Sequence, residues 1–246
     1  METAEFVGVL DREGRLLAAA AEESGTTAKV PTCPEWLVRD LLRHTGMVHR
    51  WAAAFVAEGH TAYHPDGGLP DLDGAALLTW FREGHRLLVD TLSGAAPDVR
   101  CWHFLPAPSP LVFWARRQAH ETAVHRFDAE SARGGRPAAL GTDFALDGID
   151  ELLRGFHARA GSRVRSEEPR VLRVRATDAG DAVWSVRLSE GPPVAVREET
   201  GDADCEVSGP AERLYLSLWN RLPFPDVTGD ASVAALWRER SAVTWS

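Results

Sequence analysis

The chain has 246 residues, 44% hydrophobic and 26% charged, which is the balance of a soluble globular protein with one large domain or two ordinary ones. Its formal net charge of −9 argues against nucleic acid as the main partner. The sequence contains no apolar run of about 18 residues, so no membrane span is predicted. The three cysteines lie far apart, and the N-terminal residues do not resemble a signal peptide. We therefore expect a cytoplasmic protein without a disulfide framework.

The first 160 residues are predicted to be helical. Apolar residues at helical spacing, with glycine or Ser-Gly after several of the segments, predict helices over 6–23, 34–58, 74–92, 110–133 and 142–159. The second of these has Thr32 as a candidate N-cap and Pro34 in its first turn. Long helices joined by loops predict an antiparallel bundle.

The pattern changes near Gly161. Residues 171–176 and 182–188 alternate apolar and polar side chains, as half-buried strands do, with a hairpin turn predicted at 178–181. Shorter strands are predicted at 194–196 and 205–207, and helices at 210–219 and 231–240. The sequence thus predicts an all-helical domain over residues 1–160, followed by a smaller α+β domain over residues 161–246.

One stretch of the fourth helix carries the chemistry. Residues 120–128 read His-Glu-Thr-Ala-Val-His-Arg-Phe-Asp, which differs from the zinc-protease pattern H-E-x-x-H. His120 and His125 are five positions apart, about 140° around a helix, and cannot share a metal ion from one face. Glu121 and His125 are four apart and can, since both side chains lie on one face. A carboxylate and an imidazole suit a borderline divalent cation such as zinc.

A third ligand has to come from another helix. Nine histidines are available, and His44 is one candidate among several. It lies one turn after Asp40, which could hold its second ring nitrogen. Two histidines and one carboxylate would leave metal positions open, as in a catalytic site. Ordinary surface or hydrogen-bonded residues remain the alternative at this point.

Three segments, residues 30–51, 119–130 and 207–223, resemble the mycothiol-dependent maleylpyruvate isomerase family of the DinB-like superfamily. The resemblance implies a DinB-like four-helix bundle in which His44, Glu121 and His125 hold zinc or another divalent metal. It also implies a sterol-carrier-like form for the C-terminal α+β domain. The implied chemistry uses mycothiol as a metal-bound thiolate that adds to an electrophilic small molecule, by S-transfer or by cis–trans isomerisation of the maleylpyruvate type.

Further charged residues lie in or next to these segments. The resemblance places a basic residue near the active site in the region of Arg221, where it could hold a substrate carboxylate or the thiol cofactor. Asp128 could orient His125 or pair with Arg126 at the surface. Arg117, like Arg116, is interpreted as a solvated charge.

Two other functions keep the same bundle. A metal-dependent hydrolase would hold water at the open metal position and would need a general base beside it. A non-catalytic binding or regulatory protein would not need an open position. For the enzyme we expect mycothiol and a small-molecule electrophile as partners, no nucleic acid or membrane, and a monomer or weak homodimer.

Overall fold

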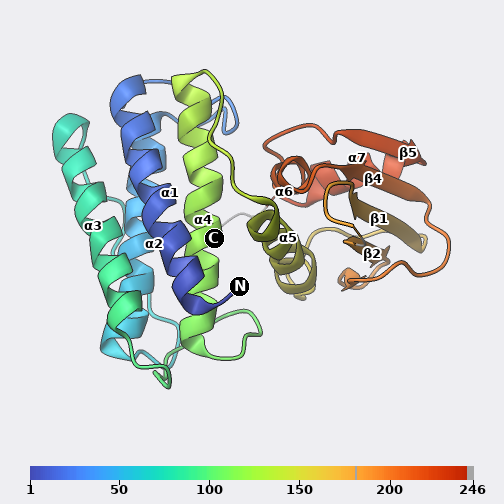
Figure 1. Ribbon diagram of the computed structural model, residues 1–246, viewed down its shortest axis with the longest axis horizontal. Helices are drawn as coiled ribbons and strands as arrows, with labels where there is room; N and C mark the ends of the chain where they lie inside the picture. Colours follow the sequence, from blue (N-terminus) through green and yellow to red (C-terminus); the bar gives the residue numbers. More distant parts are fainter. Residues whose placement is uncertain (181, 243–246) are drawn as a thin grey trace. The chain divides into compact units, whose positions relative to one another are not determined.

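The computed structural model describes residues 1–180 and 182–242, and its contacts divide the chain into two compact units, Met1–Ala138 and Ala139–Ser246 (Figure 1). The expected boundary near residue 160 differs from this division. Helix α5 (Thr142–Asp150) packs against α6 (Ala211–Leu218), and Gly141 N donates to Glu212 Oε1 at 2.7 Å. Because these contacts hold α5 to the C-terminal unit, the division falls before α5.

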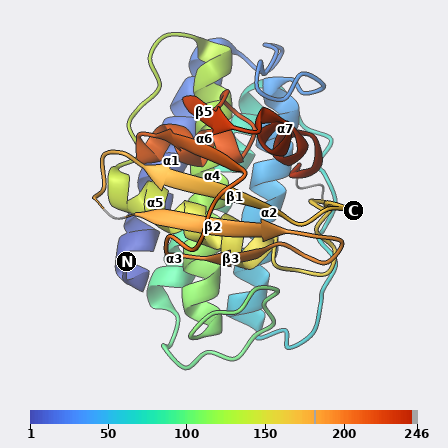
Figure 2. The ribbon, with the colours of Figure 1, turned by 90° about the vertical axis from the view of Figure 1, so that its right-hand side faces the viewer.

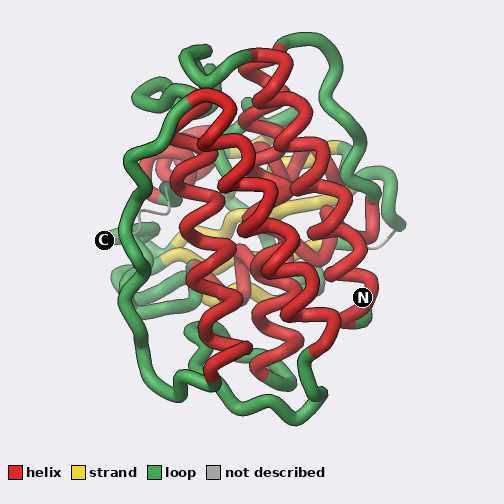
Figure 3. Tube along the Cα trace, turned by 90° about the vertical axis from the view of Figure 1, so that its left-hand side faces the viewer, coloured by secondary structure: helices red, strands yellow, loops and turns green. Residues whose placement is uncertain are grey.

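The first unit is a four-helix bundle, as predicted (Figure 3). The buried faces of the four helices form its core, in which Leu10, Leu41, Phe81 and Trp114 are fully buried. The ends of α2 differ from the expectation, because this helix begins at Val38 and Pro34 lies in a preceding turn. The bundle helices are α1 (Thr3–Ser24), α2 (Val38–Glu58), α3 (Gly74–Gly94) and α4 (Pro110–Arg133).

The expected antiparallel order is wrong for two neighbouring pairs of helices. In the first pair, α1 and α4, Glu13 contacts Arg126 and Glu23 contacts Arg133, so these helices run parallel.

The second pair is α2 and α3. Arg43 donates to the carbonyl of Leu72 just before α3, and Arg50 donates to the carbonyl of Trp80 further along it. Positions therefore increase together along both helices, so α2 and α3 run parallel. The 15-residue segment 59–73 makes this possible, since it runs back along the side of the bundle (Figure 2, cyan).

Two glycines let side chains of neighbouring helices approach α2 and α3 closely. A Cβ on Gly46 would lie 2.3 Å from a ring atom of Trp80, and a Cβ on Gly84 would lie 1.9 Å from Nη1 of Arg50. The Arg50 guanidinium also lies over the Trp80 ring, 3.9 Å from its centroid. Glycine at these two positions therefore leaves the space that the Trp80 ring and the Arg50 guanidinium occupy between α2 and α3.

The second unit is an α+β domain, as predicted, with a five-stranded mixed sheet in the order β3-β2-β1-β4-β5. Strands β1 and β2 pair antiparallel as expected, with Val174 opposite Trp184, while β1 and β4 are parallel. The turn predicted between β1 and β2 includes Asp181, which lies outside the described residues. The elements after α5 are β1 (Arg170–Ala176), β2 (Val183–Leu188), β3 (Val194–Val196), β4 (Cys205–Gly209), α6, β5 (Asp226–Gly229) and α7 (Ala231–Arg240).

Two features of this unit differ from the sequence prediction. The helix expected to continue to residue 159 changes at Glu151 into a π-helical turn that ends at Phe156. Strand β5 was not predicted, because all of its residues are exposed at the sheet edge and show no alternation. In the described part of the chain, none of the helices is both long and apolar enough to cross a membrane.

Candidate metal centre

Three side chains from two helices of the bundle direct their ligand atoms toward one another. His44 lies on α2, while Glu121 and His125 lie one turn apart on α4. One ligand atom from each lies within 4.8 Å of the others. The Nε2 atoms of both histidines lie 3.2 Å from Oε1 of Glu121. The structure thus brings together the three residues that the sequence and the resemblance indicated.

The carboxylate of Glu121 is divided between the two histidines and a buried arginine. Oε1 faces the imidazoles, whereas Oε2 lies 3.6 Å from Nη2 of Arg117, whose side chain is 2% exposed. Burial would raise the pKa of Glu121, but the hydrogen bonds from His125 and His44 and the Arg117 charge hold this pKa well below its ordinary value. Glu121 is therefore ionised, as a metal ligand has to be.

Arg117 is not the solvated charge that the sequence suggested. It precedes Glu121 by four residues, the same spacing that places Glu121 beside His125. The signal was therefore present in the sequence. It was missed because the charged residues of α4 suggest a solvated face, whereas this helix is buried on almost all sides.

Asp128 orients His125, which decides between the two alternatives for this residue. Oδ2 of Asp128 lies 2.9 Å from Nδ1 of His125, and Asp128 is fully buried. With the Nδ1 proton donated to Asp128, Nε2 is directed toward Glu121 and His44. Burial lowers the pKa of His125, but Asp128 and Glu121 outweigh it and raise this pKa, so a metal ion has to compete with a proton here.

The partner expected for His44 has a different role. Asp40 does not hold its second ring nitrogen; Oδ2 of Asp40 accepts instead from the backbone N–H of Leu37 at 3.0 Å, at the start of α2. The neighbour of His44 is Trp36, whose ring centroid lies 5.1 Å from the His44 ring and 5.9 Å from the His125 ring. An indole therefore covers one side of both imidazoles.

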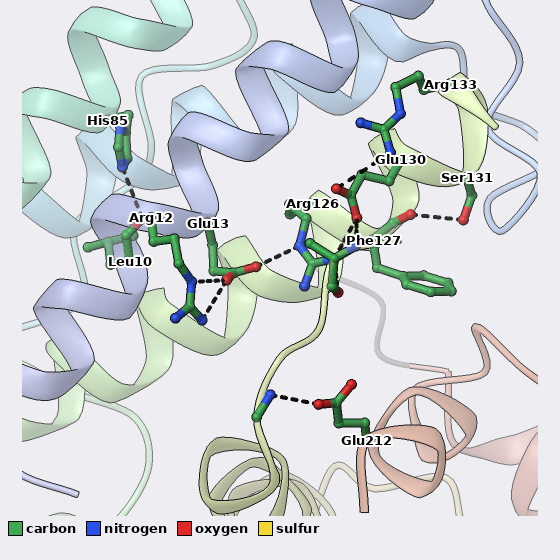
Figure 4. Close-up of polar contacts among 12 residues, drawn as sticks. Leu10, Arg12, Glu13, His85, Arg126, Phe127, Glu130, Ser131, Arg133 and Glu212 are labelled. Atoms are coloured by element: carbon green, nitrogen blue, oxygen red, sulfur yellow. Dashed lines mark hydrogen bonds and ion pairs between the residues drawn. The ribbon is translucent and has the colours of Figure 1, made fainter. Parts of the chain in front are cut away.

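A buried ion cluster begins at the residue after His125 (Figure 4). Arg126 on α4 donates to Glu13 of α1 at 2.6 Å and to Glu130 at 2.5 Å, and all three side chains are almost fully buried. The same guanidinium donates to the carbonyl of Ala138 at 2.8 Å. These contacts fix α4 against α1. Because α4 carries Glu121 and His125, they also fix two of the three metal-site residues.

The donor set is one that could hold a divalent metal ion. Two imidazole nitrogens and one carboxylate oxygen are ligands that zinc accepts, and three protein ligands leave a position for an exogenous group. The side chains of His44, Glu121 and His125 are 14%, 7% and 9% exposed, so the centre is shielded but not closed.

Arg221 lies in the second unit, in the turn after α6. It is half-buried, and its Nη1 donates to the carbonyl of Trp219 at 2.9 Å. Its position in this turn does not test the role expected for it, which remains a prediction.

Comparison with known proteins decides the family. The N-terminal domain model of mycothiol maleylpyruvate isomerase matches residues 7–130, and the C-terminal domain model of the same family matches residues 143–236. The chain belongs to this family. A crystal structure of a mutant of the mycothiol-dependent maleylpyruvate isomerase is similar, with a TM-score of 0.62, 10% sequence identity and 90% of each chain covered. At that identity the likeness shows the fold alone, and no curated protein matches the chain in sequence.

Proposed function

We propose that this member of the mycothiol maleylpyruvate isomerase family is a zinc-dependent enzyme. It would use mycothiol as its thiol and add it to an electrophilic small molecule, by S-transfer or by cis–trans isomerisation. The observation that carries the proposal is the position of Glu121 Oε1, 3.2 Å from Nε2 of both His44 and His125. Family membership supports the choice of thiol.

Each residue of the centre has a separate task. His44, Glu121 and His125 would hold the metal ion, which when bound would supply a Lewis acid that lowers the pKa of a coordinated thiol. Asp128 would fix the orientation of the His125 ring by accepting the Nδ1 proton, so that Nε2 is directed at the metal position. Trp36 shields one side of the imidazoles from water.

The competing hydrolase needs a general base beside the open position. Glu121 is used as a ligand in our proposal. Asp128, the carboxylate next to His125, already accepts from His125 Nδ1 and from the Thr32 hydroxyl. Neither is available to take a proton from water, which favours a thiol as the nucleophile.

The remaining expectations complete the proposal. Arg221 would hold a carboxylate of the substrate or of the thiol. The protein would act on small molecules as a monomer or weak homodimer, without nucleic acid or membrane. A reducing cytoplasm fits Cys33, Cys101 and Cys205, which form no disulfide within the described residues.

The test is a titration of the cobalt-substituted protein with mycothiol, followed by the thiolate-to-cobalt charge-transfer band. The expected result is a saturable band in the wild type, no band in Glu121→Ala, and an unchanged band in His64→Ala. His64 is an exposed histidine outside the set and serves as the matched control.

Two outcomes would contradict the proposal. Cobalt bound stoichiometrically without a band at any thiol concentration would favour the hydrolase. Failure of the wild type to bind cobalt or zinc would favour a binding or regulatory protein.

A further inference from the structure

The segment before α2 is a compact double turn that ends at the metal centre. The carbonyl of Val30 accepts from the N–H of Cys33 at 3.0 Å, and the carbonyl of Cys33 accepts from the N–H of Trp36 at 2.8 Å. These are two consecutive β-turns, and each has a proline, Pro31 or Pro34, at its second position. The N–H of Val30 also donates to the carbonyl of Trp36 at 3.0 Å. The segment 30–36 is thus internally fixed, and we call it the Trp36 turn.

The Trp36 turn is joined to α4 at Asp128. The hydroxyl of Thr32 donates to Oδ1 of Asp128 at 2.6 Å, and Sγ of Cys33 lies 3.7 Å from Oδ2. Oδ2 is also the atom that accepts from Nδ1 of His125. One buried carboxylate therefore contacts a metal-site imidazole through Oδ2 and the Trp36 turn through both oxygens.

Trp36 makes the second connection between this turn and the centre. Its ring contacts both the His44 and the His125 imidazoles. Because the turn is internally hydrogen-bonded, a shift at Thr32 moves the indole with it. The position of Asp128 therefore determines both the orientation of His125 and the position of the aromatic wall beside it.

We infer that Thr32 and Asp128 are positioning residues that couple metal binding at His125 to the closure of the Trp36 turn over the centre. A metal ion bound by His125 would fix the imidazole ring. The fixed ring would hold the Asp128 carboxylate in place and strengthen its hydrogen bond to Thr32. By thermodynamic reciprocity, closing the turn tightens metal binding at the centre by the same factor by which metal binding favours the closed turn. The inference rests on the proposed metal site.

The first variant is Thr32→Val, which removes the hydroxyl but keeps the shape and leaves the His125–Asp128 bond in place. We expect the zinc dissociation constant to rise about fivefold. In the wild type, zinc should slow amide hydrogen exchange at Cys33 and Trp36, and in Thr32→Val this protection should be lost. Thr32→Ser should restore both, and Thr32→Ala is the second variant if valine impairs folding.

A control separates coupling from a loss of stability. Ser109 caps the far end of α4 with its hydroxyl, which accepts from Val112 N at 3.3 Å, sixteen residues before His125. Ser109→Ala should lower the melting temperature, as loss of an N-cap does. It should leave the zinc dissociation constant and the zinc-dependent exchange of the Trp36 turn unchanged.

The double variant Thr32→Val/Asp128→Asn tests whether Thr32 acts through Asp128. If it does, the two effects on the zinc dissociation constant will not add, because Asp128→Asn alone already breaks the connection. Wild-type affinity and wild-type exchange in Thr32→Val, or additive effects in the double variant, would overturn the inference while leaving the metal site intact. A wild type that binds no zinc would overturn both.

Discussion

Arg117 and Glu121 form an ion pair inside the bundle, with Nη2 and Oε2 3.6 Å apart and side chains 2% and 7% exposed. The pair links the metal centre to a buried charge one turn earlier on α4. Oε2 of Glu121 faces Arg117, while Oε1 faces both histidines. A buried carboxylate depends on such partners, because the protein interior solvates charge poorly.

Arg117→Met should therefore lower the free energy of unfolding by about 3 kcal/mol, the lower end for a broken buried pair, because the histidines still face Glu121. Urea denaturation of the metal-free protein measures the change. Arg15→Met is the matched control, since Arg15 is 70% exposed in its pair with Asp11 and should cost under about 1 kcal/mol. Equal losses for the two variants would show that Arg117 does not stabilise Glu121.

Zinc should stabilise the folded protein through His44, Glu121 and His125. At a free zinc concentration about 1,000 times the dissociation constant, linkage predicts about 4 kcal/mol of added stability. His125→Ala should lose metal binding, activity and this increment while the helical circular dichroism is retained. Full metal content in this variant, measured by elemental analysis after dialysis, would show that the proposed site is incorrect.

The ion cluster of Arg126, Glu13 and Glu130 should respond differently to partial and complete removal. Arg126→Met leaves two buried carboxylates without the cation between them and should cost about 3–5 kcal/mol. The triple variant Arg126→Met/Glu13→Gln/Glu130→Gln removes all three charges and should recover most of that loss. If the triple variant is as unstable as the single one in denaturant titrations, side-chain packing rather than charge is responsible.

The second unit should lose stability in acid because of His157. Burial lowers the pKa of His157 to about 4, from an ordinary value of 6.5. Between these two values the unfolded chain binds a proton that the folded chain does not. His157 therefore leaves the free energy of unfolding unchanged above about pH 6.5 and lowers it as the pH decreases. At pH 5 the loss from this group is about 2 kcal/mol.

Calorimetric unfolding at pH 7 and pH 5 measures this dependence. His157→Phe keeps a ring beside Trp237, whose centroid lies 4.7 Å from that of His157, and should remove this part of the acid sensitivity. His64→Ala, which changes an exposed histidine, should unfold with the wild-type pH dependence. An equal pH dependence in wild type and His157→Phe would show that another group is responsible.

Local sequence patterns determined much of the fold. Helical spacing with clear end signals predicted the bounds of α4 and α7, and alternation predicted β1 and β2, because these signals act between residues a few positions apart. The same spacing rule identified Glu121 and His125 as a pair. Local rules placed the start of α2 incorrectly, because Pro34 suits a β-turn as well as a first helical turn.

Only the tertiary structure decided which distant residues meet. Nothing in the spacing of His44 specifies its contact with Glu121, 77 positions away, since that contact depends on how α2 packs against α4. Burial likewise gives Arg117 and Asp128 their roles, and the long crossing between α2 and α3 makes those helices parallel. Sequence by itself determined most of the elements and one ligand pair. The packing of the helices completed the site, because proximity across a bundle is a property of all four helices together.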